Sequence, residues 1–454
     1  MKQRNLKISI SGVRGIVGDT LTPQIIVRFA QAFGTFIKSG KVVIGRDTRP
    51  SGEMLKYAVI SGLLSTGCEI IDLGIVPVPT LQLMVRKLNA DGGIMITASH
   101  NPIEWNALKF VNSLGTFLTQ PQIEYLINIY HHSSFSLKPS TEYKDIIEDN
   151  SAYEAHISDI LSSVDTKKIR QKKFKVVLDS CNGAGSIITV KLLKELGCEV
   201  IPINTDITKI FPRNPEPIPE NLVQLCEVVK KEHAVVGFAQ DADADRLAIV
   251  SDKGEAIGEE YTLAFAVKNV LSKTNDLTNS SVVINLSTSK MVEDICNEHN
   301  IKCYRTKVGE INVVEKIVKM NAIIGGEGNG GVIYPKVNLC RDSLCGIALV
   351  LELMANTNLS ISELTEKIPK YYMTKTKISL PSDKIMLVLN HFRKKFSGQE
   401  CNFEDGLRIV FPEGWIHLRP SNTEPIIRIV VETVSNQQTN QLITQIFNEI
   451  KTIV

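Results

Sequence analysis

The sequence has no long apolar run, no closely spaced cysteine pair and no excess of charge of either sign. No run approaches the roughly 18 apolar residues that a spanning helix needs, and the opening MKQRNLKISIS is too polar for a secretory signal. The nine cysteines include no C-x-x-C pair, which argues against a disulfide framework. Lys and Arg number 51 against 49 Asp and Glu, so no basic nucleic-acid surface is expected. We therefore expect a cytoplasmic protein that binds neither membranes nor nucleic acid.

Two common catalytic motifs are also missing. Without G-x-S-x-G, an α/β-hydrolase nucleophile turn is unsupported, and without a Walker A sequence so is a P-loop NTPase. The function must therefore be sought in other motifs.

The 454 residues are enough for three or four domains at roughly 150 residues or fewer for each domain. Short β-branched runs, such as Val42–Gly45, Lys175–Asp179 and Val282–Asn285, alternate with helical patterns. This alternation predicts α/β domains with largely parallel sheets. Each of these three runs leads into a small polar loop, which indicates three similar units. The predicted domains are 1–150, 151–252 and 253–368, all α/β, and a smaller α+β domain at 369–454.

The densest group of functional side chains is DADADR, which ends at Arg246. In an extended backbone Asp241, Asp243 and Asp245 would project to one side, where they repel one another unless a cation lies among them. Carboxylate ligands suit a hard ion, Mg²⁺ first, with Mn²⁺ or Ca²⁺ as alternatives. An EF-hand is excluded because Arg246 takes the place of the turn glycine and the flanks resemble strands. The remaining alternative is a solvated acidic loop.

The segment GIMITASHNPIEWNALKF places Ser99 and His100 just after a predicted buried strand. Active sites of α/β proteins form at the carboxyl ends of strands, so the Ser99 hydroxyl is a candidate nucleophile. A polar turn that ends at Pro102 is the structural alternative.

Two further segments suggest ligand binding. RPSNTEPIIRI combines two guanidinium groups with neutral donors, which suits phosphate, although a surface turn is the alternative. Its candidate residues are Arg419, Ser421, Asn422, Thr423 and Arg428. IIGGEGNGGVIYP contains G-x-G-x-x-G, but its extended continuation lacks the helix that a dinucleotide site requires. Its glycines suggest a backbone held close to a polar ligand that Glu327 and Asn329 contact.

Taken in order, these motifs resemble the α-D-phosphohexomutase superfamily. TASHNP is similar to its phosphoserine loop, DADADR to its metal loop, GGEGNGG to its sugar-recognition loop and RPSNTEP to its phosphate-binding loop. The resemblance extends from GVRG near the amino end to the last domain. It implies three related α/β domains and a smaller α+β domain around a central cleft.

The resemblance also implies the reaction, which moves phosphate reversibly between O6 and O1 of a hexose. Ser99 would carry the phosphoryl group and pass through a bisphosphorylated sugar, with a sugar 1,6-bisphosphate as activator. One Mg²⁺ per chain would be held by the Ser99 phosphate and the three aspartates. Lys109 would carry protons, assisted by His100, and Arg14 and Arg246 would hold phosphoryl oxygens. The chain would act as a monomer or homodimer.

The sequence departs from the family pattern at several positions. Ala242 replaces the glycine of the metal loop, and Asn329 and Gly331 replace the serine and histidine of the sugar loop. In KVGE, Lys307 and Glu310 correspond to a family loop where glucose- and mannose-specific enzymes often carry KTGH. An acidic Glu310 suits a nearby amino group, so glucosamine phosphate is the expected substrate. The alternatives are glucose or mannose phosphates, a metal-dependent phosphatase and a non-catalytic sugar-phosphate sensor.

Overall fold

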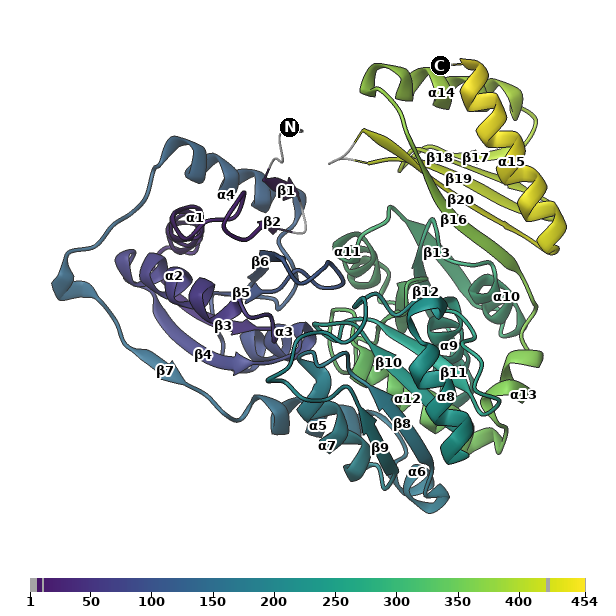
Figure 1. The fold of residues 1–454 in the computed structure, drawn as a ribbon, viewed down its shortest axis with the longest axis horizontal. Coiled ribbons are helices and arrows are strands. Elements are labelled where there is room, and N and C mark those ends of the chain that lie inside the picture. Colours follow the sequence, from purple (N-terminus) through teal and green to yellow (C-terminus); the bar gives the residue numbers. More distant parts are fainter. Residues whose placement is uncertain (1–5, 10–11, 422–424, 454) are drawn as a thin grey trace.

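The computed structural model describes residues 6–9, 12–421 and 425–453, and its strands form four sheets that follow one another along the chain (Figure 1). The β-branched runs of the sequence form buried strands because both faces of each α/β sheet are covered by helices. The expected class, three α/β units followed by an α+β unit, is confirmed.

The first unit contains a seven-stranded mixed sheet covered on both faces. Its strands lie in the order β1 (Lys7–Ser9), β2 (Gly12–Ile16), β6 (Trp105–Asn112), β5 (Gly92–Ile96), β3 (Lys41–Arg46), β4 (Glu69–Ile75) and β7 (Ile146–Glu148). One face packs against α1 (Pro23–Phe36), α2 (Gly52–Ser65) and α4 (Gln120–His132), and the other against α3 (Val78–Lys87). Along β3, Ile44 faces the first group of helices and Val43 faces α3.

The second and third units each have a four-stranded sheet. The second has the order β11 (Leu247–Ser251), β10 (Val236–Gln240), β8 (Lys175–Asp179) and β9 (Glu199–Ile203). The third has the order β13 (Lys302–Thr306), β12 (Ser281–Asn285), β14 (Ile324–Glu327) and β15 (Gly331–Ile333). In the second unit, β11 is antiparallel to its neighbour, as β15 is in the third.

Helices cover both of these sheets, and one continuous apolar core joins the two units. The helices are α5 (Ala152–Ser163), α6 (Thr166–Lys172), α7 (Gly185–Glu195), α8 (Val223–Glu232), α9 (Glu260–Lys273), α10 (Met291–Glu298), α11 (Glu310–Met320), α12 (Ser343–Thr357) and α13 (Ile361–Glu366). Phe238 of β10 and Leu349 of α12 belong to the same buried cluster.

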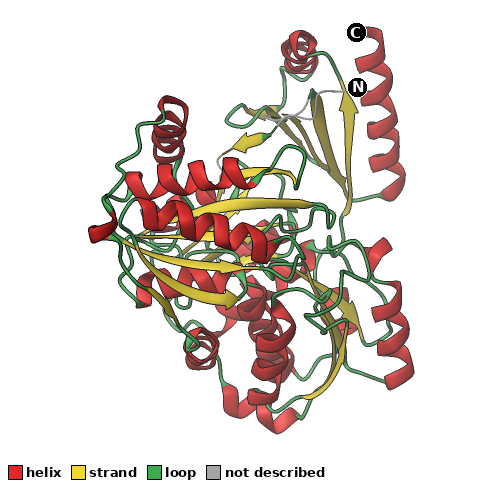
Figure 2. Ribbon diagram, turned by 60° about the vertical axis from the view of Figure 1, so that its left-hand side comes forward, coloured by secondary structure: helices red, strands yellow, loops and turns green. Residues whose placement is uncertain are grey.

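The fourth unit is an antiparallel sheet with helices on one face. Its order is β16 (Tyr372–Ser379), β20 (Ile426–Thr433), β19 (Gly414–Pro420), β18 (Leu407–Phe411) and β17 (Glu400–Asn402). Helices α14 (Ser382–Lys395) and α15 (Asn436–Ile453) bury their apolar sides against it, and Figure 2 shows α15 lying along the sheet.

Candidate active site

The serine loop runs from the end of β5 to the start of β6 and brings Ser99 to the metal loop. Ser99 is buried, and its Oγ donates a hydrogen bond to Asp241 Oδ2 at 2.8 Å. Ser99 Oγ also lies 3.3 Å from His100 Nδ1. The Ser99 backbone has a φ of +50°, a left-handed conformation that is uncommon for a residue with a Cβ. The loop predicted from TASHNP therefore lies beside the predicted metal loop.

The three aspartates of the metal loop lie between β10 and β11 and are fully buried. One oxygen from each lies within 4.8 Å of the other two. The extended geometry expected from the alternating sequence is wrong, because the backbone forms a turn in which Ala244 has a φ of +55°. Ala242, which replaces the family glycine, is absent from the described residues with positive φ, so the alanine imposes no left-handed strain there.

The triad has the donor set that a hard divalent cation requires. Asp243 Oδ1 and Asp245 Oδ1 are buried and have no hydrogen-bond partner among the described residues. Buried carboxylate oxygens normally have a partner, and an all-oxygen set is the one that Mg²⁺ or Ca²⁺ prefers. A divalent metal ion therefore fits this site.

Two protein cations already lie against the same carboxylates. Lys109 of β6 places its Nζ 2.7 Å from Asp243 Oδ2, and Arg341 places its Nη2 2.5 Å from Asp245 Oδ2. Burial and the neighbouring carboxylates raise the pKa of Asp241 well above its usual value. Burial also opposes ionisation of Asp243, but Lys109 outweighs this effect and lowers the pKa of Asp243. Between these two carboxyl groups, the protein therefore favours the neutral form of Asp241 and the ionised form of Asp243.

The two candidate proton carriers have pKa values shifted in opposite directions. The charge of Arg246, together with burial, lowers the pKa of His100 well below its ordinary value. Burial alone would lower the pKa of Lys109, but the charges of Asp243 and Asp245 outweigh it and raise that pKa. At neutral pH His100 is therefore uncharged and able to accept a proton, whereas Lys109 is charged and able to donate one.

The two other predicted arginines lie at the edges of these loops. Arg14 Nη1 donates to Asn101 Oδ1 in the serine loop at 2.8 Å. Arg246 follows the triad directly, and its Nη1 lies 3.5 Å from Glu216 Oε1. Both guanidinium groups are thus close to the serine loop or the metal loop.

The sugar loop begins at the carboxyl end of β14, where Glu327 is buried and surrounded by donors. Glu327 accepts hydrogen bonds from Asn285 Nδ2 and the Gly309 amide, both at 2.8 Å, and pairs with Arg341 Nη1 at 2.8 Å. Burial opposes its ionisation, but Arg341 and these donors together lower its pKa. In the same loop, Asn329 Oδ1 is buried without a hydrogen-bond partner among the described residues.

The glycines of this loop make room for protein atoms. An ideal Cβ at Gly328 would lie 2.0 Å from Glu260 Oε2, and one at Gly330 would lie 2.2 Å from the Leu247 carbonyl oxygen. Gly330 also has a φ of +84°. At these two positions the absence of a Cβ lets protein atoms approach, and the expectation that the loop backbone lies close to a ligand stays a prediction.

Of the two KVGE residues, Glu310 is bonded to the arginine that also bonds the metal loop and the sugar loop. Glu310 begins α11, is buried and accepts a hydrogen bond from Arg341 Nε at 3.0 Å. Burial raises the pKa of Glu310 to about 7, although Arg341 lowers it. Lys307 is exposed.

The predicted phosphate loop joins β19 to β20 in the fourth unit. Arg419 and Arg428 are direct partners across these antiparallel strands, so both side chains leave the same face of the sheet. Arg419 Nε donates to Asp405 Oδ2 at 2.6 Å, and the same oxygen accepts the Val308 amide at 3.0 Å. Ser421 follows β19, while Asn422 and Thr423 lie outside the described residues.

Sequence reasoning missed two arginines, the buried Arg49 and the largely buried Arg341. Arg341 is bonded to carboxylates of the metal loop, of α11 and of the sugar loop, and Arg49 to the serine loop. A signal was present in GRDTR and in CRDS, because each sets Asp beside Arg just after a buried strand or loop. Charged residues so placed are seldom buried unless they are paired.

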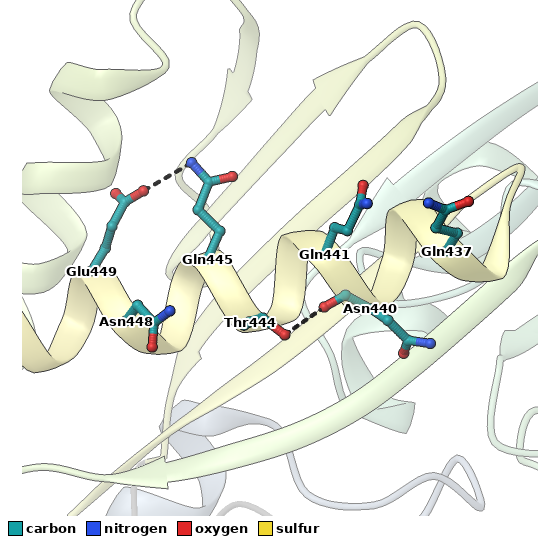
Figure 3. A pocket seen from close by; sticks show the side chains of 7 residues that line it. All are labelled: Gln437, Asn440, Gln441, Thr444, Gln445, Asn448 and Glu449. Atoms are coloured by element: carbon teal, nitrogen blue, oxygen red, sulfur yellow. Dashed lines mark hydrogen bonds between the residues drawn. The ribbon is translucent and has the colours of Figure 1, made fainter.

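The molecule also has a shallow hollow far from these loops, along α15 (Figure 3). Its seven lining residues all come from that one helix, and Gln445 Nε2 donates to Glu449 Oε1 there at 3.0 Å. No second element contributes a converging group, so the chemistry is placed at the four loops.

Most of the chain matches models of one enzyme class, the intramolecular phosphotransferases that isomerise phosphosugars. Residues 6–136, 154–254 and 259–372 match the phosphoglucomutase/phosphomannomutase alpha/beta/alpha domains I, II and III, and residues 374–449 match the C-terminal domain. The chain therefore belongs to the phosphoglucomutase/phosphomannomutase family, within the α-D-phosphohexomutase superfamily, and is an enzyme of the isomerase class.

Individual relatives agree over nearly the full length. A phosphoglucomutase/phosphomannomutase of Thermococcus kodakarensis is 39% identical over 95% of each chain. A phosphoglucosamine/phosphogalactosamine mutase of Sulfurisphaera tokodaii is 35% identical over 98% of each. The solved structure of a family protein from Burkholderia thailandensis aligns with a TM-score of 0.83 at 27% identity, covering 98% of this chain and 97% of that one. Within the described ranges, no helix is long and apolar enough to cross a membrane.

Proposed function

We propose that this phosphohexomutase interconverts glucosamine 6-phosphate and glucosamine 1-phosphate. The observation that carries the proposal is a group of three buried carboxyl groups, from the metal loop, α11 and the sugar loop, that share one guanidinium. Asp245, Glu310 and Glu327 all bond to the single guanidinium of Arg341. A substrate ammonium group would supply further positive charge, which a plain hydroxyl cannot do. The names of several relatives, including the Sulfurisphaera tokodaii enzyme, support the same substrate.

In the proposed mechanism Ser99 carries the phosphoryl group. When the bisphosphorylated sugar returns a phosphate, a bond forms between Ser99 Oγ and phosphorus while the bond from phosphorus to the sugar oxygen breaks. The Ser99 proton can pass to the neutral Nδ1 of His100, 3.3 Å away. Lys109, which is held protonated, can donate a proton to the leaving sugar oxygen.

Asp241, Asp243, Asp245 and the phosphorylated Ser99 would hold the metal ion, which we propose to be one Mg²⁺ per chain. The bound ion would neutralise charge on the phosphoryl oxygens. We further propose that Arg14 and Arg246 contact the transferring phosphoryl group and that Lys307, Glu310, Glu327 and Asn329 contact the sugar. In the fourth unit the proposed ligands of the second phosphate are Arg419, Ser421, Asn422, Thr423 and Arg428. A sugar 1,6-bisphosphate would phosphorylate Ser99 and so activate the enzyme.

The test is a side-by-side mutase assay of glucosamine 6-phosphate, glucose 1-phosphate and mannose 1-phosphate. Each is supplied with Mg²⁺ and a catalytic amount of sugar 1,6-bisphosphate, and kcat/KM values are compared. A preference for glucosamine of about tenfold or more, or 1.4 kcal/mol, supports the proposal. The Thermococcus kodakarensis relative favours the alternative, a phosphoglucomutase or phosphomannomutase. Equal or better turnover of glucose or mannose phosphate would establish that alternative.

A further inference from the structure

We propose that Arg49 is a positioning residue that holds the serine loop, residues 99–105, in the shape needed for phosphoryl transfer. The proposal rests on the role proposed for Ser99 and is independent of which sugar is the substrate. Arg49 lies between β3 and α2, is only 1% exposed and stands 50 residues before the serine in the chain.

All five N–H donors of the Arg49 guanidinium are used, four of them on the serine loop. Nη2 donates to the carbonyl oxygens of Ser99 (2.7 Å) and Asn101 (2.6 Å). Nη1 donates to those of Pro102 (2.5 Å) and Trp105 (2.9 Å). Nε donates to Asp47 Oδ2 at 3.1 Å. A planar guanidinium has five donors in a fixed fork, so its geometry fixes the relative positions of four carbonyl groups.

The loop needs such support because its backbone is strained at Ser99. A left-handed conformation is strained for a non-glycine residue and persists only where surrounding contacts hold it. At φ = +50° the Ser99 carbonyl faces Arg49 while its Oγ reaches Asp241 Oδ2. Arg49 therefore stabilises the backbone conformation that brings the serine hydroxyl to the metal loop.

A second set of bonds connects Arg49 to Ser99 through side chains. Asp47 accepts from the Arg49 amide at 3.0 Å and from Thr97 Oγ1 at 2.6 Å. Thr97 Oγ1 in turn accepts from the Ser99 amide at 3.0 Å. The Phe211 ring covers the guanidinium, with its centroid 5.0 Å from Arg49 Cζ. These hydrogen bonds and the bond from Arg49 to the Ser99 carbonyl form a closed ring of contacts. A displacement of the Arg49 guanidinium would therefore displace Ser99.

A lysine in place of Arg49 would keep the positive charge but lose the fixed arrangement of five N–H donors. Its ammonium group has three donors, so at least two of the five acceptors would be left without a partner. The prediction for Arg49→Lys is a kcat lowered by about 10²-fold, since a displacement of about 1 Å in a reacting group can have that effect. KM for the phosphosugar should change less than about threefold, because Arg49 contacts no group proposed to bind the sugar.

Three variants are compared with the wild-type enzyme in the Mg²⁺-dependent mutase assay. Arg86→Lys is the matched control, since Arg86 donates to Val337 O and Asn338 Oδ1 and touches neither the serine loop nor the metal loop. Ser99→Ala tests the proposed function itself. Mass spectrometry measures how fast sugar 1,6-bisphosphate phosphorylates Ser99 in the wild type and in Arg49→Lys.

A kcat and a phosphorylation rate lowered together in Arg49→Lys, with KM and the Arg86→Lys control unchanged, support the proposal. If Arg49→Lys has the kcat of the wild type while Ser99→Ala is inactive, the proposal for Arg49 is overturned and the proposed mutase function stands. Mutase activity in Ser99→Ala would instead contradict the proposed function, in which Ser99 carries the phosphoryl group. If Arg49→Lys does not fold, Asp47→Asn keeps the side-chain shape but replaces one acceptor oxygen by an NH2 group, which faces at least one of the three donors of Asp47. Its kcat should fall at least about fivefold at constant KM, and an unchanged kcat would equally overturn the proposal.

Discussion

One arginine organises each end of the candidate site, and the two arginines have different partners. Arg49 donates mainly to neutral carbonyl groups of a single loop. Arg341 pairs with three carboxylates, from the metal loop, α11 and the sugar loop. A guanidinium bonded to carbonyls fixes the shape of a backbone, whereas one bonded to carboxylates balances charge. The first therefore depends on the fork geometry of arginine and the second mainly on its charge.

The largest effect is expected at the serine end, from Ser99→Ala. Removing the hydroxyl that carries phosphate should lower kcat by at least about 10³-fold, while phosphosugar binding, measured by calorimetry, is retained. Ser113→Ala is the matched control, because Ser113 is exposed in the turn after β6. Undiminished turnover by Ser99→Ala would show that another group accepts the phosphate.

At the sugar end, the comparison predicts that the charge of Arg341 matters more than its shape. Arg341→Gln leaves three buried carboxylates without their cation and should destabilise the fold by about 3–5 kcal/mol. Arg341→Lys keeps the charge and should lose less than half of that free energy of unfolding, measured by urea denaturation. Equal losses in the two variants would mean that Arg341, like Arg49, acts through its geometry.

Between the two ends, Asp243→Asn tests whether the triad holds the metal. The variant removes one ligand charge, so activity should fall by about 10²-fold and the Mg²⁺ concentration for half-maximal activity should rise by about 10-fold or more. Asp276→Asn is the control, since Asp276 is exposed and accepts a hydrogen bond from the nearby Thr278 amide. An unaltered Mg²⁺ response in Asp243→Asn would place the ion elsewhere.

Sequence reasoning succeeded where local patterns carry the information. The runs at Val42, Lys175 and Val282 begin inside β3, β8 and β12, because buried strands need short β-branched segments. The metal triad was found because three alternating aspartates are an unusual composition. The turn at Ala244 was missed, since nothing in DADADR signals a left-handed alanine. The domain boundaries stay predictions, and the one at residue 252 separates two units that share a core.

The two arginines were missed for a physical reason. Arg341 and Asp245 are 96 residues apart, and four of the five acceptors of Arg49 are backbone carbonyls, which every residue has. The Asp beside Arg in GRDTR and in CRDS indicates a paired arginine but does not identify these partners. Lys109 was identified only through the family resemblance, and its 2.7 Å contact with Asp243 depends on how β6 is placed relative to the loop between β10 and β11. Roles that arise from packing between distant segments thus required the three-dimensional structure.

The smallest effect, and the sharpest test of the sugar end, is expected from Glu310→Gln. Burial raises the pKa of Glu310 to about 7, so in the free enzyme its carboxyl is neutral below that pH and ionised above it. An ammonium group nearby favours the ionised form, so the preference for glucosamine over glucose phosphate should increase as pH rises from roughly 6 to 7.5. Glu310→Gln should lower this preference by about tenfold and remove its pH dependence, with little change in kcat for glucose phosphate.

The matched control is Glu315→Gln, an exposed position on the same helix. A preference that keeps both its size and its pH dependence in Glu310→Gln would exclude Glu310 from substrate selection. Discrimination would then be sought at Asn329, whose buried Oδ1 has no hydrogen-bond partner among the described residues.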